Sequence, residues 1–205
     1  MFITFEGPEG SGKSSLIPKL SQILIESGFD IVQTREPGGT AIGDQIRNTL
    51  LSLKNEEMHP VTETLLFQAS RAQHVNQLIK PALTEGKVVL CDRYADSTMA
   101  YQGYGHQRDL TTITQIIAYA TSNLKPHMTV LLDLDVELGL QRRSGDSDNW
   151  NRLDAKEVEF HKRVRSGYHK MAAEEPDRWV IVDASRSLDD VLEDVCRIVL
   201  TKLGK

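Results

Sequence analysis

The chain has 205 residues, 40% of them hydrophobic, which is long and apolar enough for one domain with a substantial core. Its formal net charge of -5 argues against general attraction to nucleic-acid backbones or anionic membranes. The first residues lack the basic and apolar regions of a secretory signal, and no apolar stretch has the length of a membrane span, so we expect a cytoplasmic protein. Cys91 and Cys196 lie in apolar surroundings and are expected to be free thiols.

Short β-like runs alternate with longer segments of helical periodicity along the chain. The expected strands are Phe2–Phe5, Ile31–Thr34, Val88–Cys91, Thr129–Leu134 and Val180–Val182. The expected helices are Lys13–Ser27, Ala41–Leu51, Val61–Glu85 with a break or bend at Pro81, Leu110–Ser122, Val136–Arg143, Leu153–Glu174 and Leu188–Leu203. The alternation predicts a three-layer α/β fold, in which a parallel sheet of about five strands is flanked by helices. Since no repeat or linker interrupts it, we expect residues 1–205 to form a single domain.

Residues 7–15 read Gly-Pro-Glu-Gly-Ser-Gly-Lys-Ser-Ser and directly follow the first expected strand. This is the Walker A pattern, in which backbone N–H groups turn around a phosphate chain and the next helix directs its positive end at the same anion. Lys13 would reach the β/γ-phosphates of ATP, and Ser14 would bind Mg²⁺. The other residues expected at the ATP phosphates are Gly7, Glu9, Gly10, Ser11, Gly12 and Ser15. A glycine-rich turn with a chance lysine is the alternative, and the place of the complete pattern at the first strand-to-helix junction speaks against it.

Polar residues also follow the next two expected strands, where ligands gather in open parallel sheets. The second strand leads into Thr34-Arg35-Glu36-Pro37-Gly38-Gly39-Thr40, and the third into Asp92-Arg93-Tyr94 and Ser97-Thr98-Met99-Ala100-Tyr101-Gln102-Gly103. The planar guanidinium of Arg93 could bind a phosphate bidentately. Asp92 is the natural Mg²⁺ carboxylate opposite Ser14. Asp92 could instead pair only with Arg93 or cap the next helix.

Together with residues 7–15 and the string Leu65-Leu66-Phe67-Gln68-Ala69-Ser70-Arg71, these segments closely resemble the bacterial thymidylate kinases, in matching order along the chain. The resemblance implies a P-loop kinase that uses ATP and Mg²⁺ to phosphorylate thymidine monophosphate to the diphosphate. It also implies nucleotides rather than nucleic-acid polymers or membranes as partners, and a homodimer. Another pyrimidine nucleotide or deoxynucleoside kinase, a GTPase-type switch and a nucleotide-dependent scaffold are the alternatives. The lack of a guanine-reading Asn-Lys-x-Asp string argues against the switch.

The resemblance gives roles to residues around the sugar and phosphate of the acceptor. Arg93 would hold the acceptor phosphate, and Glu9 would approach the sugar 3′-hydroxyl and the phosphate. Tyr101 would crowd the 2′ position and so favour deoxyribose. Tyr168 matches an aromatic residue that approaches the acceptor nucleotide, although a helical tyrosine is at least as often a packing residue.

The resemblance assigns a second group of residues to the base. Phe67 would stack on the pyrimidine, Arg71 would hydrogen-bond its O4, and Thr98 would read its N3 edge. From spacing alone, Phe67 and Arg71 at i, i+4 would more often be core and rim. The other acceptor-site candidates are Glu36, Pro37, Ser97 and Gln102; Ser97 could equally be a helix cap.

Residues 144–151 are rich in turn formers and predict a mobile cover, so we assign a lid to about residues 143–152. Gly10 stands where some thymidylate kinases carry an arginine, so the charge of the transition state must be met from elsewhere. The candidates are the arginines beside the lid, Arg142, Arg143 and Arg152, of which Arg142 would also lie near ATP. Arg152 is the first choice because it matches the family arginine, although its neighbours Asn151 and Asp154 depart from the family pattern.

The loop after the last expected strand matches the family loop that borders the adenine ring. It consists of Asp183, Ala184 and Ser185. In the family these contacts are mostly made by the backbone, so their side chains are expected to do little.

Overall fold

The computed structural model describes residues 1–144 and 151–205, which form a sheet of five parallel strands in the order β2-β3-β1-β4-β5. The strands are β1 (Phe2–Glu6), β2 (Ile31–Arg35), β3 (Val88–Asp92), β4 (Met128–Asp133) and β5 (Trp179–Asp183). All five predicted strands are present. The predicted α/β class with a parallel sheet is therefore confirmed.

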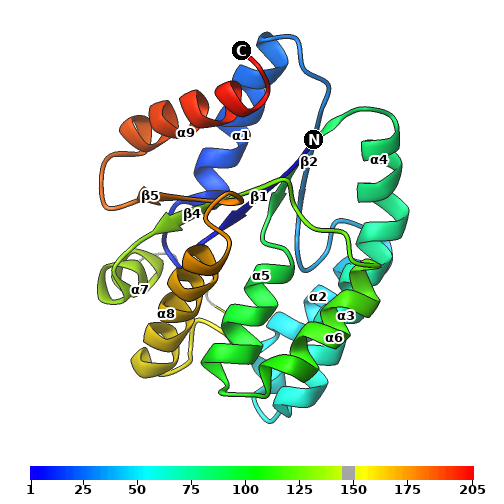
Figure 1. The fold of residues 1–205 in the computed structure, drawn as a ribbon. Helices are drawn as coiled ribbons and strands as arrows, with labels where there is room; N and C mark the ends of the chain where they lie inside the picture. Colours follow the sequence, from blue (N-terminus) through cyan, green and yellow to red (C-terminus); the bar gives the residue numbers. More distant parts are fainter. Residues whose placement is uncertain (145–150) are drawn as a thin grey trace.

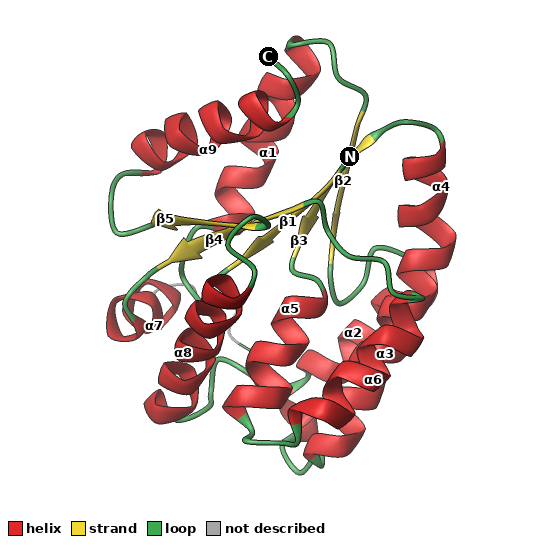
Figure 2. Cartoon of the chain, viewed as in Figure 1, coloured by secondary structure: helices red, strands yellow, loops and turns green. Residues whose placement is uncertain are grey.

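Helices cover both faces of this sheet, with α1 and α9 on one face and α4, α5, α6 and α8 on the other (Figure 1). The helix bounds are α1 (Lys13–Glu26), α2 (Ala41–Leu51), α3 (Pro60–His74), α4 (Lys80–Thr84), α5 (Ala95–Thr98), α6 (Leu110–Thr121), α7 (Val136–Ser144), α8 (Val158–Glu174) and α9 (Leu188–Lys202). One 3₁₀ turn, Leu53–Asn55, follows α2. Figure 2 shows the strands enclosed between helical layers, with loops confined to the ends of the elements. No helix in the described ranges is both long and apolar enough to cross a membrane.

The alternating side chains of the strands divide the core between the two faces. Ile3 and Phe5 of β1 pack with the apolar stripe of α1 and with α9. Phe2, on the opposite face of the same strand, packs against Tyr94 and the α4 side. Because the sheet is buried on both faces, the carboxyl ends of its strands are the open edge at which polar side chains can gather.

Two helix predictions differ from the structure. The segment predicted as Val61–Glu85 is interrupted by a π-helical turn at Val75–Ile79, one turn before Pro81, which has no N–H to give the carbonyl of the preceding turn. The helix predicted as Leu153–Glu174 begins only at Val158. Asn151 and Asp154 explain the late start, because their side chains bond the local backbone: Leu153 N donates to Asn151 Oδ1 at 2.9 Å, and Asn151 N donates to Asp154 Oδ2 at 2.9 Å.

A helical segment that the sequence did not predict follows β3. It consists of the short helix α5 and a π-helical stretch, Met99–Gly105. This segment carries Ser97, Thr98, Tyr101 and Gln102 from the sheet edge into the site.

Candidate active site

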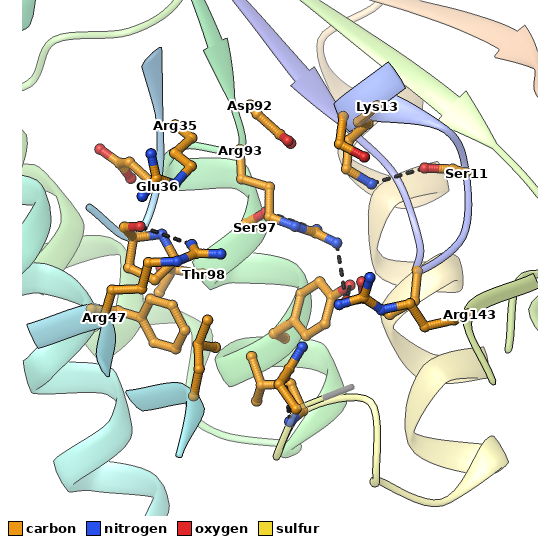
Figure 3. A pocket seen from close by; sticks show the side chains of 18 of the residues that line it. Ser11, Lys13, Arg35, Glu36, Arg47, Asp92, Arg93, Ser97, Thr98 and Arg143 are labelled. Atoms are coloured by element: carbon orange, nitrogen blue, oxygen red, sulfur yellow. Dashed lines mark hydrogen bonds and ion pairs between the residues drawn. The ribbon is translucent and has the colours of Figure 1, made fainter. Parts of the chain in front are cut away.

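A cavity of about 460 Å³ lies at the carboxyl ends of β1, β2 and β3. It brings together most of the residues predicted for the site, from separate parts of the chain. Its lining includes Glu9, Gly10, Ser11, Gly12, Lys13, Ser14, Glu36, Pro37, Phe67, Arg71, Asp92, Arg93, Ser97, Thr98, Tyr101, Gln102, Arg142 and Arg143. Figure 3 shows Lys13 and Arg143 at one end, Arg35, Glu36 and Arg47 at the other, and Arg93 between them.

The lysine of the phosphate loop, Lys13, donates hydrogen bonds to residues of its own loop. Lys13 Nζ donates to the carbonyls of Gly7 and Pro8, each at 3.0 Å, and to Ser11 Oγ at 2.8 Å. Burial, followed by the charge of Arg93, lowers the pKa of Lys13 to about 8. A phosphate chain in the loop would offset both causes, because a negative partner favours the charged form of the ammonium.

The phosphate loop packs directly on helix α7 through two glycines. Gly10 has a φ of +70°, and a Cβ added to it would lie 2.2 Å from the carbonyl oxygen of Gly139; a Cβ on Gly139 would lie 2.3 Å from the carbonyl oxygen of Glu9. Gly10 must therefore lack a side chain, since the backbone of α7 occupies the space. This contact joins the loop to the helix that carries Arg142 and Arg143.

Arg93 leaves β3 with a φ of 66° in the left-handed region, which is strained for a residue with a Cβ. Its Nη2 donates to Glu9 Oε1 at 3.0 Å, and its guanidinium lies over the ring of Tyr101, 5.0 Å from the centroid. The hydroxyl of Tyr101 donates to the same Glu9 oxygen at 2.7 Å. Burial opposes the ionisation of Glu9, but the charges of Arg93 and Lys13 outweigh it and lower the pKa of Glu9 to about 2.

The buried carboxylate of Glu6 holds Arg93 indirectly, through two hydroxyl groups. Arg93 Nη1 donates to Ser97 Oγ at 3.3 Å and to the hydroxyl of Tyr168 at 3.2 Å, and both hydroxyls donate to Glu6 Oε2. Tyr168 is fully buried and is not part of the cavity lining. In this structure it holds the guanidinium of Arg93. Ser97 is held by Glu6 and does not act as a helix cap. Burial and the charge of Asp96 raise the pKa of Glu6 to about 7.

Arg71 is held in place by four hydrogen bonds at the part of the cavity lined by Phe67, Thr98 and Gln102, which the sequence predicted for the base and which is called the base end below. Its Nε donates to Glu36 Oε2 at 2.7 Å, its Nη1 to Gln68 Oε1 and Thr98 Oγ1 at 2.9 and 2.8 Å, and its Nη2 to the carbonyl of Tyr94 at 2.8 Å. A guanidinium has five N–H groups, so one on Nη2 is left for a ligand. The oxygen of Thr98 already accepts from Gln68 and Arg71. The hydroxyl of Thr98 can thus meet a ligand only as a donor, which suits a carbonyl oxygen better than the N3–H for which the sequence predicted it.

Gln102 is the complementary acceptor at this end. Its Nε2 donates to Glu63 Oε1 at 2.8 Å, and no described residue donates to its Oε1. Gln102 lines the cavity near Phe67 and Thr98. The base end therefore offers donors from Arg71 and Thr98 and an acceptor from Gln102.

Asp92 and Ser14 fit a magnesium ion. Both line the cavity, and Asp92 Oδ1 is buried without a hydrogen-bond partner among the described residues. An unpartnered carboxylate oxygen and a hydroxyl in one cavity match the oxygen ligands that Mg²⁺ takes in phosphoryl-transfer enzymes, where phosphates and water complete the shell. Within residues 1–144 and 151–205, no group of three or more His, Cys, Asp or Glu residues forms an all-protein metal cage.

The arginines beside the lid lie in three different settings. Arg142 lines the cavity and donates to the carbonyls of Ala184 and Ser185 at 3.0 and 3.1 Å. Arg143 also lines the cavity, and its Nε donates to Asp154 at 3.2 Å. Arg152, the first choice from the sequence, is 3% exposed and absent from the lining.

Arg152 is instead an internal ion-pair residue. Its Nε donates to the carbonyl of Leu50 at 3.0 Å, and its Nη2 lies 2.6 Å from Glu63 Oε2. The late start of α8 is the reason, because it leaves Arg152 in a turn that faces α2 and α3. The expectation that Arg152 meets the transferring phosphate is not supported by this arrangement. The predicted lid, about 143–152, lies partly outside the described residues.

The remaining predicted residues lie beside the cavity rather than in its wall. Gly7 supplies a carbonyl to Lys13, and Ser15 continues α1. In the loop Asp183, Ala184 and Ser185, the backbone carbonyls of Ala184 and Ser185 accept hydrogen bonds from Arg142, which lines the cavity.

Sequence reasoning missed five lining residues: Arg35, Arg47, Leu51, Asn151 and Leu153. Arg47, on α2, donates to the carbonyl of Pro37 at 2.9 Å. Burial and the charge of Arg35 lower its pKa, as expected for cations gathered around a site for an anion. The signal for Arg35 was available, since it directly precedes Glu36 in the quoted string; Arg47 stands on an ordinary amphipathic helix with no signal of its own.

Comparison with known proteins agrees with this geometry. The family model described as thymidylate kinase matches residues 5–195. The thymidylate kinases of Roseiflexus castenholzii and Geotalea uraniireducens are 48% and 46% identical to the chain, covering 97% and 100% of it and 92% and 98% of their own lengths. The crystal structure of thymidylate kinase from Ehrlichia chaffeensis superimposes with a TM-score of 0.78 at 34% identity, over 97% of this chain and 98% of that one, which confirms the P-loop kinase fold. The chain belongs to the thymidylate kinase family.

Proposed function

We propose that this chain transfers the γ-phosphoryl group of ATP to thymidine monophosphate, giving thymidine diphosphate. The observation that carries the proposal is that one cavity joins the phosphate loop with its lysine to a second cationic residue, Arg93, and to a donor–acceptor set suited to a pyrimidine. A simple nucleotide switch has no use for the second half of this cavity. Membership of the thymidylate kinase family supports the same acceptor.

The phosphate end acts by positioning and charge rather than by a covalent intermediate. Lys13 would exchange its bonds to loop carbonyls for the β/γ-phosphates of ATP. Arg93 would hold the acceptor phosphate, with its orientation maintained by Glu9 on one side and by Ser97 and Tyr168 on the other. Of the two lid-side arginines that line the cavity, Arg142 donates to the carbonyls of Ala184 and Ser185, so we assign to Arg143 the charge that develops on the transferring group.

Asp92 and Ser14 would hold Mg²⁺. The ion would neutralise phosphate charge and fix the geometry of the triphosphate. The protein contribution to this site is the unpartnered Asp92 oxygen beside the loop.

The base end would recognise thymine by its edge and its face. Phe67 offers a ring for stacking, and the donors on Arg71 and Thr98 suit the O4 carbonyl. The Gln102 Oε1 acceptor suits the N3–H. Cytosine presents an amino group and an unprotonated N3 at these two positions, so the hydrogen bonds to the base edge would be mismatched, although stacking on Phe67 would remain.

A coupled assay of the purified protein with ATP, Mg²⁺ and a panel of nucleoside monophosphates tests the proposal. We expect thymidine monophosphate to be the best acceptor, ahead of its uracil analogue and far ahead of deoxycytidylate and the purine nucleotides. Preference for adenylate, guanylate or cytidylate would refute it. Phosphorylation of thymidine but not of its monophosphate would reassign the chain as a deoxynucleoside kinase.

We further propose that the chain works as a homodimer. Helices α2, α3 and α6 lie side by side (Figure 1) and expose the apolar side chains of Ile42, Val61, Leu65 and Tyr119, the last with 91% of its surface accessible. Exposed apolar side chains on neighbouring helices favour association. Sedimentation of the parent and of Leu65→Asp, with expected masses of a dimer and a monomer, tests it. Cytoplasmic location is part of the proposal, because both cysteines are free thiols.

A further inference from the structure

A buried ion pair connects the segment after the lid with the side chain that would read the base. Arg152 Nη2 lies 2.6 Å from Oε2 of Glu63, and Glu63 is 1% exposed. The other oxygen, Oε1, accepts a hydrogen bond from Gln102 Nε2 at 2.8 Å and lies 3.1 Å from His106 Nε2. A chain of contacts thus runs from Arg152 through Glu63 to Gln102, although only Gln102 is part of the cavity wall.

Glu63 is held in its ionised form by these neighbours. Burial opposes ionisation, but the hydrogen bond from His106, the charge of Arg152 and the hydrogen bond from Gln102 outweigh it and lower the pKa of Glu63 to about 2. An ionised carboxylate can only accept hydrogen bonds. The Gln102 amide must therefore turn its NH₂ toward Glu63 and its Oε1 away from it.

We propose that Glu63, kept charged by His106 and Arg152, sets the polarity of the Gln102 amide and thereby makes the chain select a base with an N3–H donor over one with an N3 acceptor. This inference rests on the function proposed above. Glu63 and Arg152 are positioning residues, and Gln102 is the residue that would touch the base. The reverse orientation of Gln102 would place its oxygen against a buried carboxylate and leave two acceptors facing each other without a proton, so it is strongly disfavoured.

Replacement of Glu63 by glutamine isolates this effect, because it keeps the shape of the side chain while adding a donor. In Glu63→Gln the new amide can donate to Gln102 Oε1, and Gln102 can then present its NH₂ to the cavity. We expect the affinity for thymidine monophosphate to fall and that for deoxycytidylate to rise, changing the ratio of their dissociation constants at least tenfold. The KM for ATP should stay within twofold of the parent.

The two affinities should change in opposite directions, and this distinguishes a reversed Gln102 amide from a general structural defect of the variant. A merely structural defect would weaken both nucleotides alike. Because an uncompensated Arg152 could destabilise Glu63→Gln, the pair Arg152→Lys and Arg152→Met provides a second test. The lysine variant keeps a cation at Glu63 and should retain the parental ratio of dissociation constants. The methionine variant should discriminate less strongly between the two nucleotides. Unfolding curves report whether each variant is folded.

Calorimetric titration of the parent and the three variants with both nucleotides decides the matter. If the parent prefers thymidine monophosphate and folded Glu63→Gln and Arg152→Met keep the parental ratio, the inference is wrong while the proposed function stands. If the parent itself prefers deoxycytidylate, both fail.

Discussion

The base end and the phosphate end of the cavity differ in how far the protein satisfies its own polar groups. At the base end Arg71 already makes four hydrogen bonds, and Glu36 accepts from both Arg71 and His74. At the phosphate end Lys13 is turned onto the carbonyls of its own loop, and an oxygen of Asp92 has no partner among the described residues. The base end is thus organised before a ligand arrives, whereas the phosphate end must exchange protein contacts for ligand contacts. This division suits a kinase, because the rigid end can select the acceptor while the adjustable end follows charge as it moves.

The largest test of this contrast is Lys13→Ala. Turnover should fall by about a thousandfold, the size associated with losing a cation from a phosphoryl-transfer site. The free energy of unfolding should stay the same or rise, because the buried ammonium has its pKa lowered to about 8 and its charged form is disfavoured in the fold. Lys19→Ala, an exposed residue of the same helix, is the matched control and should change neither quantity. Equal losses of activity in the two variants would contradict the role of Lys13.

The next effect concerns Arg93, which combines a ligand role with a strained backbone. Both Arg93→Ala and Arg93→Gly should raise the KM for thymidine monophosphate about a hundredfold, as expected for losing roughly 2.7 kcal/mol of charge-assisted binding. Glycine tolerates the φ of 66° at this position, so Arg93→Gly should be more stable than Arg93→Ala by about 1 kcal/mol. Steady-state kinetics and denaturant unfolding measure the two differences. An unchanged KM in either variant would remove Arg93 from the acceptor phosphate.

The lid arginines give a smaller and more discriminating effect. Arg143→Ala should slow phosphoryl transfer at least tenfold, about 1.4 kcal/mol in barrier height, because Arg143 lines the cavity. Arg152→Ala should leave the chemical step nearly unchanged, since its side chain is buried outside the cavity, where it donates to the carbonyl of Leu50 and pairs with Glu63. Single-turnover reactions at saturating ATP and thymidine monophosphate compare them. The reverse result would restore Arg152 as the catalytic arginine that the sequence suggested.

The smallest expected effect is a pH dependence at the base end. The pKa of Glu63 is lowered to about 2 in the fold, from an ordinary 4.5, so its stabilising contribution is complete above pH 4.5 and is lost as the pH falls toward 2. Between pH 4.5 and 3.5 the parent should lose about 1 kcal/mol through this group. Glu63→Gln should not show this loss of about 1 kcal/mol in the free energy of unfolding, because glutamine does not titrate. Urea unfolding of both proteins at the two pH values measures the difference, and parallel losses would contradict the lowered pKa.

Much of the fold could be read from local patterns. The five strands are short apolar runs, and the helices α1, α2, α6, α7 and α9 agree with prediction to within about two residues at each end. These elements carry their signals in consecutive residues. The start of α8 was predicted five residues early because the apolar periodicity includes Leu153, while the competing side-chain bonds of Asn151 and Asp154 become visible only in three dimensions.

The site was predictable where a motif fixes both residue type and backbone shape. Residues of the phosphate loop and of the strand ends fulfil this condition, and most of them line the cavity. Arg152 and Glu63 do not, since their pairing depends on a contact between segments 89 residues apart in sequence. Nothing in the sequence near Glu63 distinguishes a buried ion-pair partner from an acidic residue in the first turn of a helix.

The contact between Gly10 and Gly139 also bears on how such enzymes can diverge. A lineage that begins from this chain cannot gain an arginine in its phosphate loop by one substitution, because a side chain at position 10 would collide with the backbone of α7. Helix α7 would first have to withdraw, which would weaken the support of Arg142 and Arg143 before any replacement for them existed. From this chain, an arginine in the phosphate loop would therefore require changes in α7 as well as at position 10.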